Sequence, residues 1–136
     1  MIGIKDQCFG VEVEFTGITR EQAAKALAGY FGTTPHHKGG AYDTWVAKDS
    51  NGKEWKLMSD SSIRAEKWDG RGYKITEAME YRVEMVSPIL TYSELPKFQE
   101  CVRLMRHAKG KVNDSCGIHV HVDAANHKRH SLKNLL

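Results

Sequence analysis

Three stretches of the chain alternate strictly between apolar and polar residues, which is the pattern of strands that bury one face. Residues 118–123 read Ile-His-Val-His-Val-Asp, residues 8–16 read Cys-Phe-Gly-Val-Glu-Val-Glu-Phe-Thr, and residues 81–86 read Tyr-Arg-Val-Glu-Met-Val. Successive side chains of a strand point to opposite faces, so the apolar residues of each stretch predict a core-facing side. The polar residues predicted on the opposite faces include Glu12, Glu14, Arg82, Glu84, His119 and His121.

A tight hairpin is predicted in the middle of the chain, between strands at residues 43–48 and 53–59. The Asp-Ser-Asn-Gly sequence that joins them suits the positive φ angles of a hairpin turn. Trp45 and Trp55 lie on the two arms and are expected to bracket one apolar surface. Lys56 follows Trp55 and therefore points to the opposite side of the second arm, which we expect to be the side of the acidic residues.

The segments that flank this hairpin are predicted to be irregular. Residues 33–40 and 64–79 are rich in glycine and polar residues, which predicts loops. His36 and His37 in the first of them are interpreted as surface histidines. Asp60 follows the second arm of the hairpin in an Asp-Ser-Ser turn.

Two helices are predicted from their capping signals. Thr19 with Gln22 and Thr91 with Glu94 both have the spacing of a capping box, in which each side chain satisfies a backbone N–H of the first turn. Gly32 is a suitable C-terminal cap for the first helix. The second helix is expected to run to about residue 107. Its expected inward residues are Leu95, Phe98, Val102, Met105 and, as a further candidate, Leu104.

The predicted order of elements is strand, helix, three strands, helix and strand, followed by a third helix whose N-cap is Ser131. This order indicates the α+β class, with an antiparallel β-sheet and the helices packed on one face. A length of 136 residues fits a single domain, which we assign to residues 1–136.

Composition excludes several classes of protein. The formal net charge of +3 comes without a basic run, so no specific nucleic-acid partner is expected. No apolar run approaches the ~18–20 residues of a membrane span, and no signal peptide is recognisable, so no membrane association is expected. The three cysteines show no Cys-x-x-Cys spacing, which argues against a disulfide framework and favours a reducing, cytoplasmic location.

An antiparallel sheet could gather the polar faces of the three alternating strands into one acidic and histidine-bearing surface. Crowded carboxylates repel one another, and a divalent cation removes that repulsion. Oxygen ligands with one imidazole suit Mg²⁺ or Mn²⁺. Other interpretations stay open: an ordinary solvated sheet face, a metal-dependent hydrolase that uses the His-x-His strand, a catalytic thiol at Cys116 with His119, and a non-catalytic binding module.

Four blocks of sequence, in order, resemble the amidoligase family. They are residues 9–15 (Phe-Gly-Val-Glu-Val-Glu-Phe), 60–63 (Asp-Ser-Ser-Ile), 83–88 (Val-Glu-Met-Val-Ser-Pro) and 116–123 (Cys-Gly-Ile-His-Val-His-Val-Asp). This family belongs to the carboxylate–amine ligases that share the catalytic fold of glutamine synthetase and glutamate–cysteine ligase. The Gly-x-His-x-His block is also similar to the corresponding segment of glutamine synthetase.

The resemblance implies ATP-dependent formation of an amide or isopeptide bond through an acyl phosphate, with Mg²⁺ or Mn²⁺ as cofactor. The partners would be ATP and small-molecule or peptide substrates that carry a carboxylate and an amine. By the resemblance, the metal ligands would be Glu12, Glu14, Glu84 and His119. His121 would act near the γ-phosphate, Asp60 would bind metal or orient substrate, and Lys56 and Arg82 would contact phosphate.

Family members are typically about twice as long as this chain, so the resemblance implies the N-terminal half of a catalytic domain that is truncated at its C-terminus. A sheet that ends after the histidine strand would expose an edge. Exposed edges pair readily with other chains, so a homodimer through this edge is expected.

Overall fold

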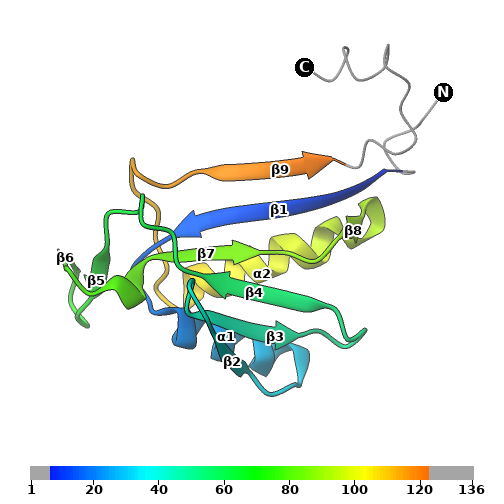
Figure 1. Ribbon diagram of the computed structural model, residues 1–136, viewed down its shortest axis with the longest axis horizontal. Coiled ribbons are helices and arrows are strands. Elements are labelled where there is room, and N and C mark those ends of the chain that lie inside the picture. Colours follow the sequence, from blue (N-terminus) through cyan, green and yellow to red (C-terminus); the bar gives the residue numbers. More distant parts are fainter. Residues whose placement is uncertain (1–6, 123–136) are drawn as a thin grey trace, which may run out of the picture.

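One antiparallel sheet and two helices organise residues 7–122, which are the residues that the computed structural model describes (Figure 1). The strands lie in the spatial order β2, β3, β4, β7, β1 and β9, and the short β8 continues along the β7 side of β1. The strands are β1 (Cys8–Phe15), β2 (His36–Gly39), β3 (Thr44–Lys48), β4 (Glu54–Met58), β7 (Val83–Val86), β8 (Leu90–Thr91) and β9 (Ile118–Val122).

Both helices, α1 (Arg20–Phe31) and α2 (Leu95–His107), cover the same face of this sheet (Figure 1). The capping box at Thr19 is formed as predicted, and Gly32 ends α1 in the left-handed region at φ 73°. The capping box at Thr91 is also formed, but it starts a 3₁₀ turn that leads into α2. The α+β class, the antiparallel sheet and the one-sided helices are therefore confirmed.

The core lies between the helices and the apolar faces of the central strands. Alternation works as predicted in β1, where Val11, Val13 and Phe15 are buried while the intervening residues face away from the helices. Trp45 and Trp55 share this core side of the sheet, since Trp45 lies opposite Leu57 and Ala47 opposite Trp55 in the strand register. The other buried core residues include Ala23, Ala24, Leu27, Val83, Met85, Leu90, Cys101 and Met105.

The inward face of α2 differs from the prediction at two positions. Cys101 is 0% exposed and belongs to the core, whereas Val102 is 37% exposed. The buried stripe therefore passes from Phe98 to Cys101 and Met105, at a spacing of three and four residues, and Val102 lies at its edge.

Two segments predicted to be loops contain strands. Residues 64–79 form the hairpin β5 (Glu66–Trp68) and β6 (Tyr73–Ile75), whose turn is closed by Asp69 Oδ1 accepting bonds from two backbone N–H groups. Residues 33–40 contain β2, an edge strand on which the His37 ring stacks over Trp45 with centroids 4.4 Å apart. Both histidines of β2 remain exposed.

Boundaries shift slightly elsewhere. The strand predicted at 81–86 begins at Val83, because Met79–Tyr81 forms a 3₁₀ turn (η2). The third helix predicted from Ser131 lies outside the described residues. No helix within residues 7–122 is long and apolar enough to cross a membrane.

Asp49 ties the β3–β4 turn to α2. Its side chain is 0% exposed and accepts four hydrogen bonds. Oδ1 accepts from the backbone N–H groups of Asn51 and Lys53, and Oδ2 accepts from Trp55 Nε1 at 3.1 Å and Lys97 Nζ at 2.9 Å. The predicted Asp-Ser-Asn-Gly turn thus carries a buried ion pair that joins sheet and helix.

Candidate acidic metal site

Strand register gathers the predicted acidic and histidine residues on the sheet face that points away from the helices. Glu14 lies directly opposite Glu84 of β7, and Glu12 lies directly opposite His119 of β9. His121 lies opposite Gly10, on the same face. Directly opposed residues share a face in an antiparallel pair, so three neighbouring strands supply this surface.

The ligating atoms form two groups of three, and Glu84 belongs to both. One group contains Glu12, Glu84 and His119, and the other contains Glu14, Asp60 and Glu84. Within each group the candidate ligand atoms lie within 4.8 Å of one another. Asp60 joins the second group because it follows Met58, which pairs with Glu84 at the end of β4. The structure thus brings together the four predicted metal ligands and Asp60, for which metal binding was one of two expected roles.

Uncompensated negative charge is concentrated at Glu84. The pKa of this carboxyl is raised from 4.5 to about 7. Its burial is the largest cause, and the negative charges of Glu12, Asp60 and Glu14 raise the pKa further. Crowding of carboxylates around a half-buried glutamate is therefore the cause of the shift.

Glu14 and Asp60 form a carboxyl pair within the second group. Burial is the largest cause that raises the pKa of Glu14, and its hydrogen bond with Asp60 adds to it. The pKa of Asp60 is lowered instead, and the hydrogen bond from the Ser62 side chain is the largest cause. Ser62 donates from Oγ at 2.6 Å and from its backbone N–H at 2.9 Å. The opposite shifts make Glu14 the more readily protonated carboxyl of the pair.

The raised pKa of Glu84 predicts how stability changes with pH in the absence of divalent cations. Between about pH 4.5 and pH 7 the folded state keeps a proton that the unfolded state has lost. The free energy of unfolding should therefore fall as the pH rises through this range and level off above it. Glu84→Gln, which mimics the protonated form, should remove most of this decline. Urea unfolding in EDTA measures both, and an equal decline in the variant would contradict the assignment.

The two histidines lie beside Glu12 from β9. His119 Nδ1 is 3.7 Å and His121 Nε2 is 3.4 Å from Glu12 Oε2. Both imidazoles remain largely exposed. Only His119 falls within a group of three candidate ligands among the described residues, so the geometry separates the two histidines.

The two predicted phosphate-contacting cations occupy different surroundings. Lys56 lies opposite Val86, which itself lies opposite Glu12, so it is on the acidic face two strands away. Arg82 directly precedes β7, and its extended backbone (φ −96°, ψ 107°) continues the alternation onto the face of Glu84. Its Nε is buried and has no hydrogen-bond partner among residues 7–122.

Sequence reasoning missed the groups that hold the ligands in place. The Gly117 backbone N–H donates to Glu14 Oε1 at 2.8 Å, and a Cβ on Gly117 would lie 3.3 Å from that oxygen. Ser62, within the Asp-Ser-Ser turn, orients Asp60. The contact between Ser62 and Asp60 could have been predicted, because an Asp side chain in a turn commonly accepts hydrogen bonds from the residue two positions later. The glycine contact depends on the pairing of distant strands and leaves no local signal.

The turn before β9 is fastened to the segment that follows Asp60. Asn113 Nδ2 donates to the Arg64 carbonyl oxygen and to Glu66 Oε2, and the Arg64 backbone N–H donates to Ser115 Oγ. These bonds fix the two turns that deliver Asp60 and His119 to the site. Cys116 lies in the same turn, and its Sγ contacts Asn113 Oδ1 at 3.6 Å, so this contact does not support a Cys116–His119 catalytic pair.

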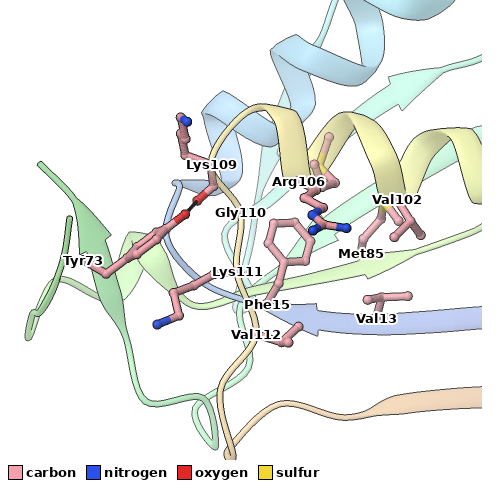
Figure 2. Close-up of a pocket in the computed structure, with 11 residues that line it drawn as sticks. Val13, Phe15, Tyr73, Met85, Val102, Arg106, Lys109, Gly110, Lys111 and Val112 are labelled. Atoms are coloured by element: carbon pink, nitrogen blue, oxygen red, sulfur yellow. Dashed lines mark hydrogen bonds between the residues drawn. The ribbon is translucent and has the colours of Figure 1, made fainter. Parts of the chain in front are cut away.

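Two hollows lie away from the acidic face. A cavity of about 570 Å³ opens between β1, the end of α2 and the following segment, on the helix side of the sheet (Figure 2). Val13, Phe15 and Met85, which alternate with the acidic residues, form its floor. A smaller hollow of about 370 Å³ lies at the start of α1, beside the His37–Asp43 contact of 2.6 Å.

Comparisons with known proteins give one match. A family model described as "Putative amidoligase enzyme" matches residues 5–136, which is nearly the whole chain. No curated protein and no solved structure matches the chain. The matched region contains all four sequence blocks and every residue of the acidic site. The chain therefore belongs to the amidoligase family.

Proposed function

We propose that this chain carries the catalytic face of an ATP-dependent ligase that joins a carboxylate to an amine. The observation that carries the proposal is the pair of three-residue ligand groups that share Glu84 on one sheet face. Membership of the amidoligase family supports ligase chemistry. The antiparallel sheet with one-sided helices is compatible with part of the catalytic fold of glutamine synthetase, and we propose that relationship as well.

The residues present fit two divalent cations. Four carboxylates and one imidazole form the two groups, and this oxygen-rich donor set suits Mg²⁺ or Mn²⁺. The raised pKa of Glu84 supports the same conclusion, because burial and the neighbouring carboxylates destabilise its ionised form and a divalent cation would offset that effect. Glu12 and His119 would hold one ion, Glu14 and Asp60 the other, and Glu84 would contact both.

The proposed reaction has two steps. A carboxylate oxygen of the first substrate attacks the γ-phosphorus of ATP, the bond to ADP breaks, and an acyl phosphate forms. An amine nitrogen then attacks the acyl carbon, inorganic phosphate leaves, and the nitrogen loses a proton to give the amide. Bound divalent cations would neutralise the triphosphate and the charge that develops on it.

The protein's own side chains would bind and orient the phosphates. His121 follows His119 by two residues on the same face of β9, and Gly10 lies opposite it. A Cβ on Gly10 would meet nothing within 4 Å, so the surface beside the His121 imidazole is open. This opening gives room for a γ-phosphate beside the imidazole. Arg82 and Lys56 lie on the same face and supply positive charge for the triphosphate. The acid and the amine would be small molecules or peptides.

Nucleotide binding separates the roles of the two histidines. We expect a non-hydrolysable ATP analogue to bind in Mn²⁺ and to lose nearly all affinity in EDTA. His121→Ala should weaken nucleotide binding by about tenfold and leave Mn²⁺ binding unchanged, because one charge-assisted hydrogen bond is lost. His119→Ala should weaken both. Calorimetric titration of each variant measures these affinities.

The same titrations distinguish the other functions. His36→Ala, on exposed β2, is the matched control and should bind like the wild type. A metal-dependent hydrolase would instead require His119 and His121 together for a single transition-metal ion and would not need nucleotide. Binding of Mn²⁺ without nucleotide affinity in the folded chain would contradict the ligase and favour a binding module. We also propose a cytoplasmic location, in agreement with the three free cysteines and with the proposed use of ATP.

A further inference from the structure

Arg20, the first residue of α1, is a buried cation that lies outside the acidic site. Its side chain is 5% exposed and donates four hydrogen bonds. Nη2 donates to Asp43 Oδ2 at 2.8 Å and Nε donates to the Asp43 carbonyl oxygen at 3.2 Å. Nη1 donates to the carbonyl oxygens of Met79 at 2.9 Å and Arg82 at 2.8 Å. One guanidinium therefore joins the start of α1 to the segment that leads into β7.

The charge and the donors of Arg20 are satisfied within the fold. The hydrogen bond from Arg20 is the largest cause that lowers the pKa of Asp43, so this carboxyl is the counter-ion of the buried guanidinium. A guanidinium has five N–H donors, and four hydrogen bonds of Arg20 already go to acceptors of the protein. Arg20 is therefore suited to hold neighbouring backbone in place rather than to contact a ligand.

The backbone of Arg82 lies outside the sheet ladder. The pairs of β7 with β1 begin at Val83 and those with β4 begin at Glu84, so no described strand pair includes Arg82. Its backbone N–H donates to the Met79 carbonyl oxygen at 3.0 Å, and its carbonyl oxygen accepts from Arg20. Glu84, in contrast, pairs with strands on both sides. Loss of the bond from Arg20 should therefore release Arg82 while leaving Glu84 in place.

The side chain of Arg82 carries a donor without an acceptor. Its Nε is buried and has no hydrogen-bond partner among the described residues, 7–122. A buried donor that is left unpaired costs free energy, and an anionic ligand would remove that cost. A planar guanidinium matches the oxygens of a phosphate group, so a bound phosphate would supply the acceptor.

We propose that Arg20 is a positioning residue for Arg82: it holds the Arg82 carbonyl oxygen so that the Arg82 guanidinium stays on the acidic face, ready for the triphosphate. This inference rests on the proposed binding of nucleotide at that face. Preorganisation raises affinity because the side chain need not be ordered when the ligand binds. Lysine cannot replace Arg20, since one ammonium does not reproduce the planar fork that reaches two carbonyl oxygens and a carboxylate.

Arg20→Lys tests this role because it keeps the buried positive charge. The variant should weaken binding of the non-hydrolysable ATP analogue by about tenfold, the effect of one lost charge-assisted hydrogen bond, and leave Mn²⁺ affinity unchanged. In an Arg82→Met background the same substitution should change analogue affinity by less than about twofold, because Arg20 acts through Arg82. Arg103→Lys makes the same change at an exposed position of α2 and is the matched control. Calorimetric titration measures each affinity.

Nuclear magnetic resonance tests the positioning without nucleotide. The signal of Arg82 Nε–H, identified by its loss in Arg82→Met, should be sharp in the wild type before any ligand is added. In Arg20→Lys it should shift and broaden, while the backbone amide signal of Glu84 stays in place. Asp43→Asn weakens the ion pair of Arg20 but leaves both carbonyl bonds, so it should lower the free energy of unfolding without moving the Arg82 signal.

The outcomes separate the positioning role from the proposed ligase function. A broadened Arg82 signal in the wild type, or an unmoved one in folded Arg20→Lys protein, would overturn the proposal. An equal loss of analogue affinity with and without the Arg82 side chain would also overturn it, because Arg20 would then act by another route. A wild-type chain that binds no analogue would contradict the proposed function, and the Arg82 signal would still show whether Arg20 holds Arg82 in place.

Discussion

Glu84→Gln is expected to weaken Mn²⁺ binding by at least about 100-fold, because loss of even an outer partner of a metal ligand typically costs 10–100-fold. The reason for so large an effect is that Glu84 belongs to both ligand groups, whereas every other member belongs to one. Glutamine keeps the shape of the side chain and removes its negative charge. The same variant should be more stable than the wild type in EDTA near neutral pH, since it no longer carries the repelled carboxylate.

Electron paramagnetic resonance of free Mn²⁺ measures this affinity and the number of ions bound. Glu12→Gln and Glu14→Gln should each reduce the number from two to one, because each residue serves a single group. Glu77→Gln makes the same chemical change at an exposed position outside both groups and is the matched control. A Glu84→Gln protein that still binds two ions with wild-type affinity would rule out the shared ligand.

Asp49→Ala should lower the free energy of unfolding by about 3–5 kcal/mol, the range for breaking a buried ion pair by removing one partner. The substitution leaves Lys97 Nζ, Trp55 Nε1 and two backbone N–H groups without their acceptor. Burial alone would raise the pKa of Asp49, but the hydrogen bonds led by Lys97 outweigh it and lower the pKa. This contribution is therefore present at neutral pH and is lost as the pH falls into the acid range.

Urea and thermal unfolding measure the effect, and a drop in Tm of more than about 10 °C is expected for a chain of this size. Asp114→Ala is the control, since Asp114 is 82% exposed in its ion pair with Arg64. Such surface pairs contribute less than about 1 kcal/mol. Similar losses in the two variants would show that the buried network around Asp49 does not stabilise the fold as inferred.

Local patterns were enough to predict the elements that build the site. Alternation identified β1, which buries its apolar face, and β9, whose Ile118, Val120 and Val122 are exposed rather than core-facing as predicted. The capping box at Thr19 identified the start of α1, and the box at Thr91 identified the 3₁₀ turn that leads into α2. The hairpin β5–β6 was missed because its strands are three residues each, too short for a period to show. Edge strand β2 was missed because it exists through pairing with β3.

The residues of the acidic site could be predicted from sequence, but their arrangement into two ligand groups could not. Glu12, Glu14, Glu84 and His119 were expected to be metal ligands, and Asp60 was expected to bind metal or orient substrate. The division into two groups depends on register: Met58 opposite Glu84 brings Asp60 to Glu14. Register between strands 26 residues apart in sequence is set by packing of the whole sheet, so no local pattern encodes it.

The most direct test of the proposed metal and nucleotide site is a crystal structure with Mn²⁺ and a non-hydrolysable ATP analogue, using anomalous scattering to locate the ions. The proposal predicts two anomalous peaks on the open sheet face, one bound by Glu12 and His119, the other by Glu14 and Asp60, with Glu84 contacting both. The triphosphate should lie over these ions with His121 at its γ-phosphate. Nucleotide bound elsewhere, or a single ion held by both histidines, would contradict the proposed ligase site.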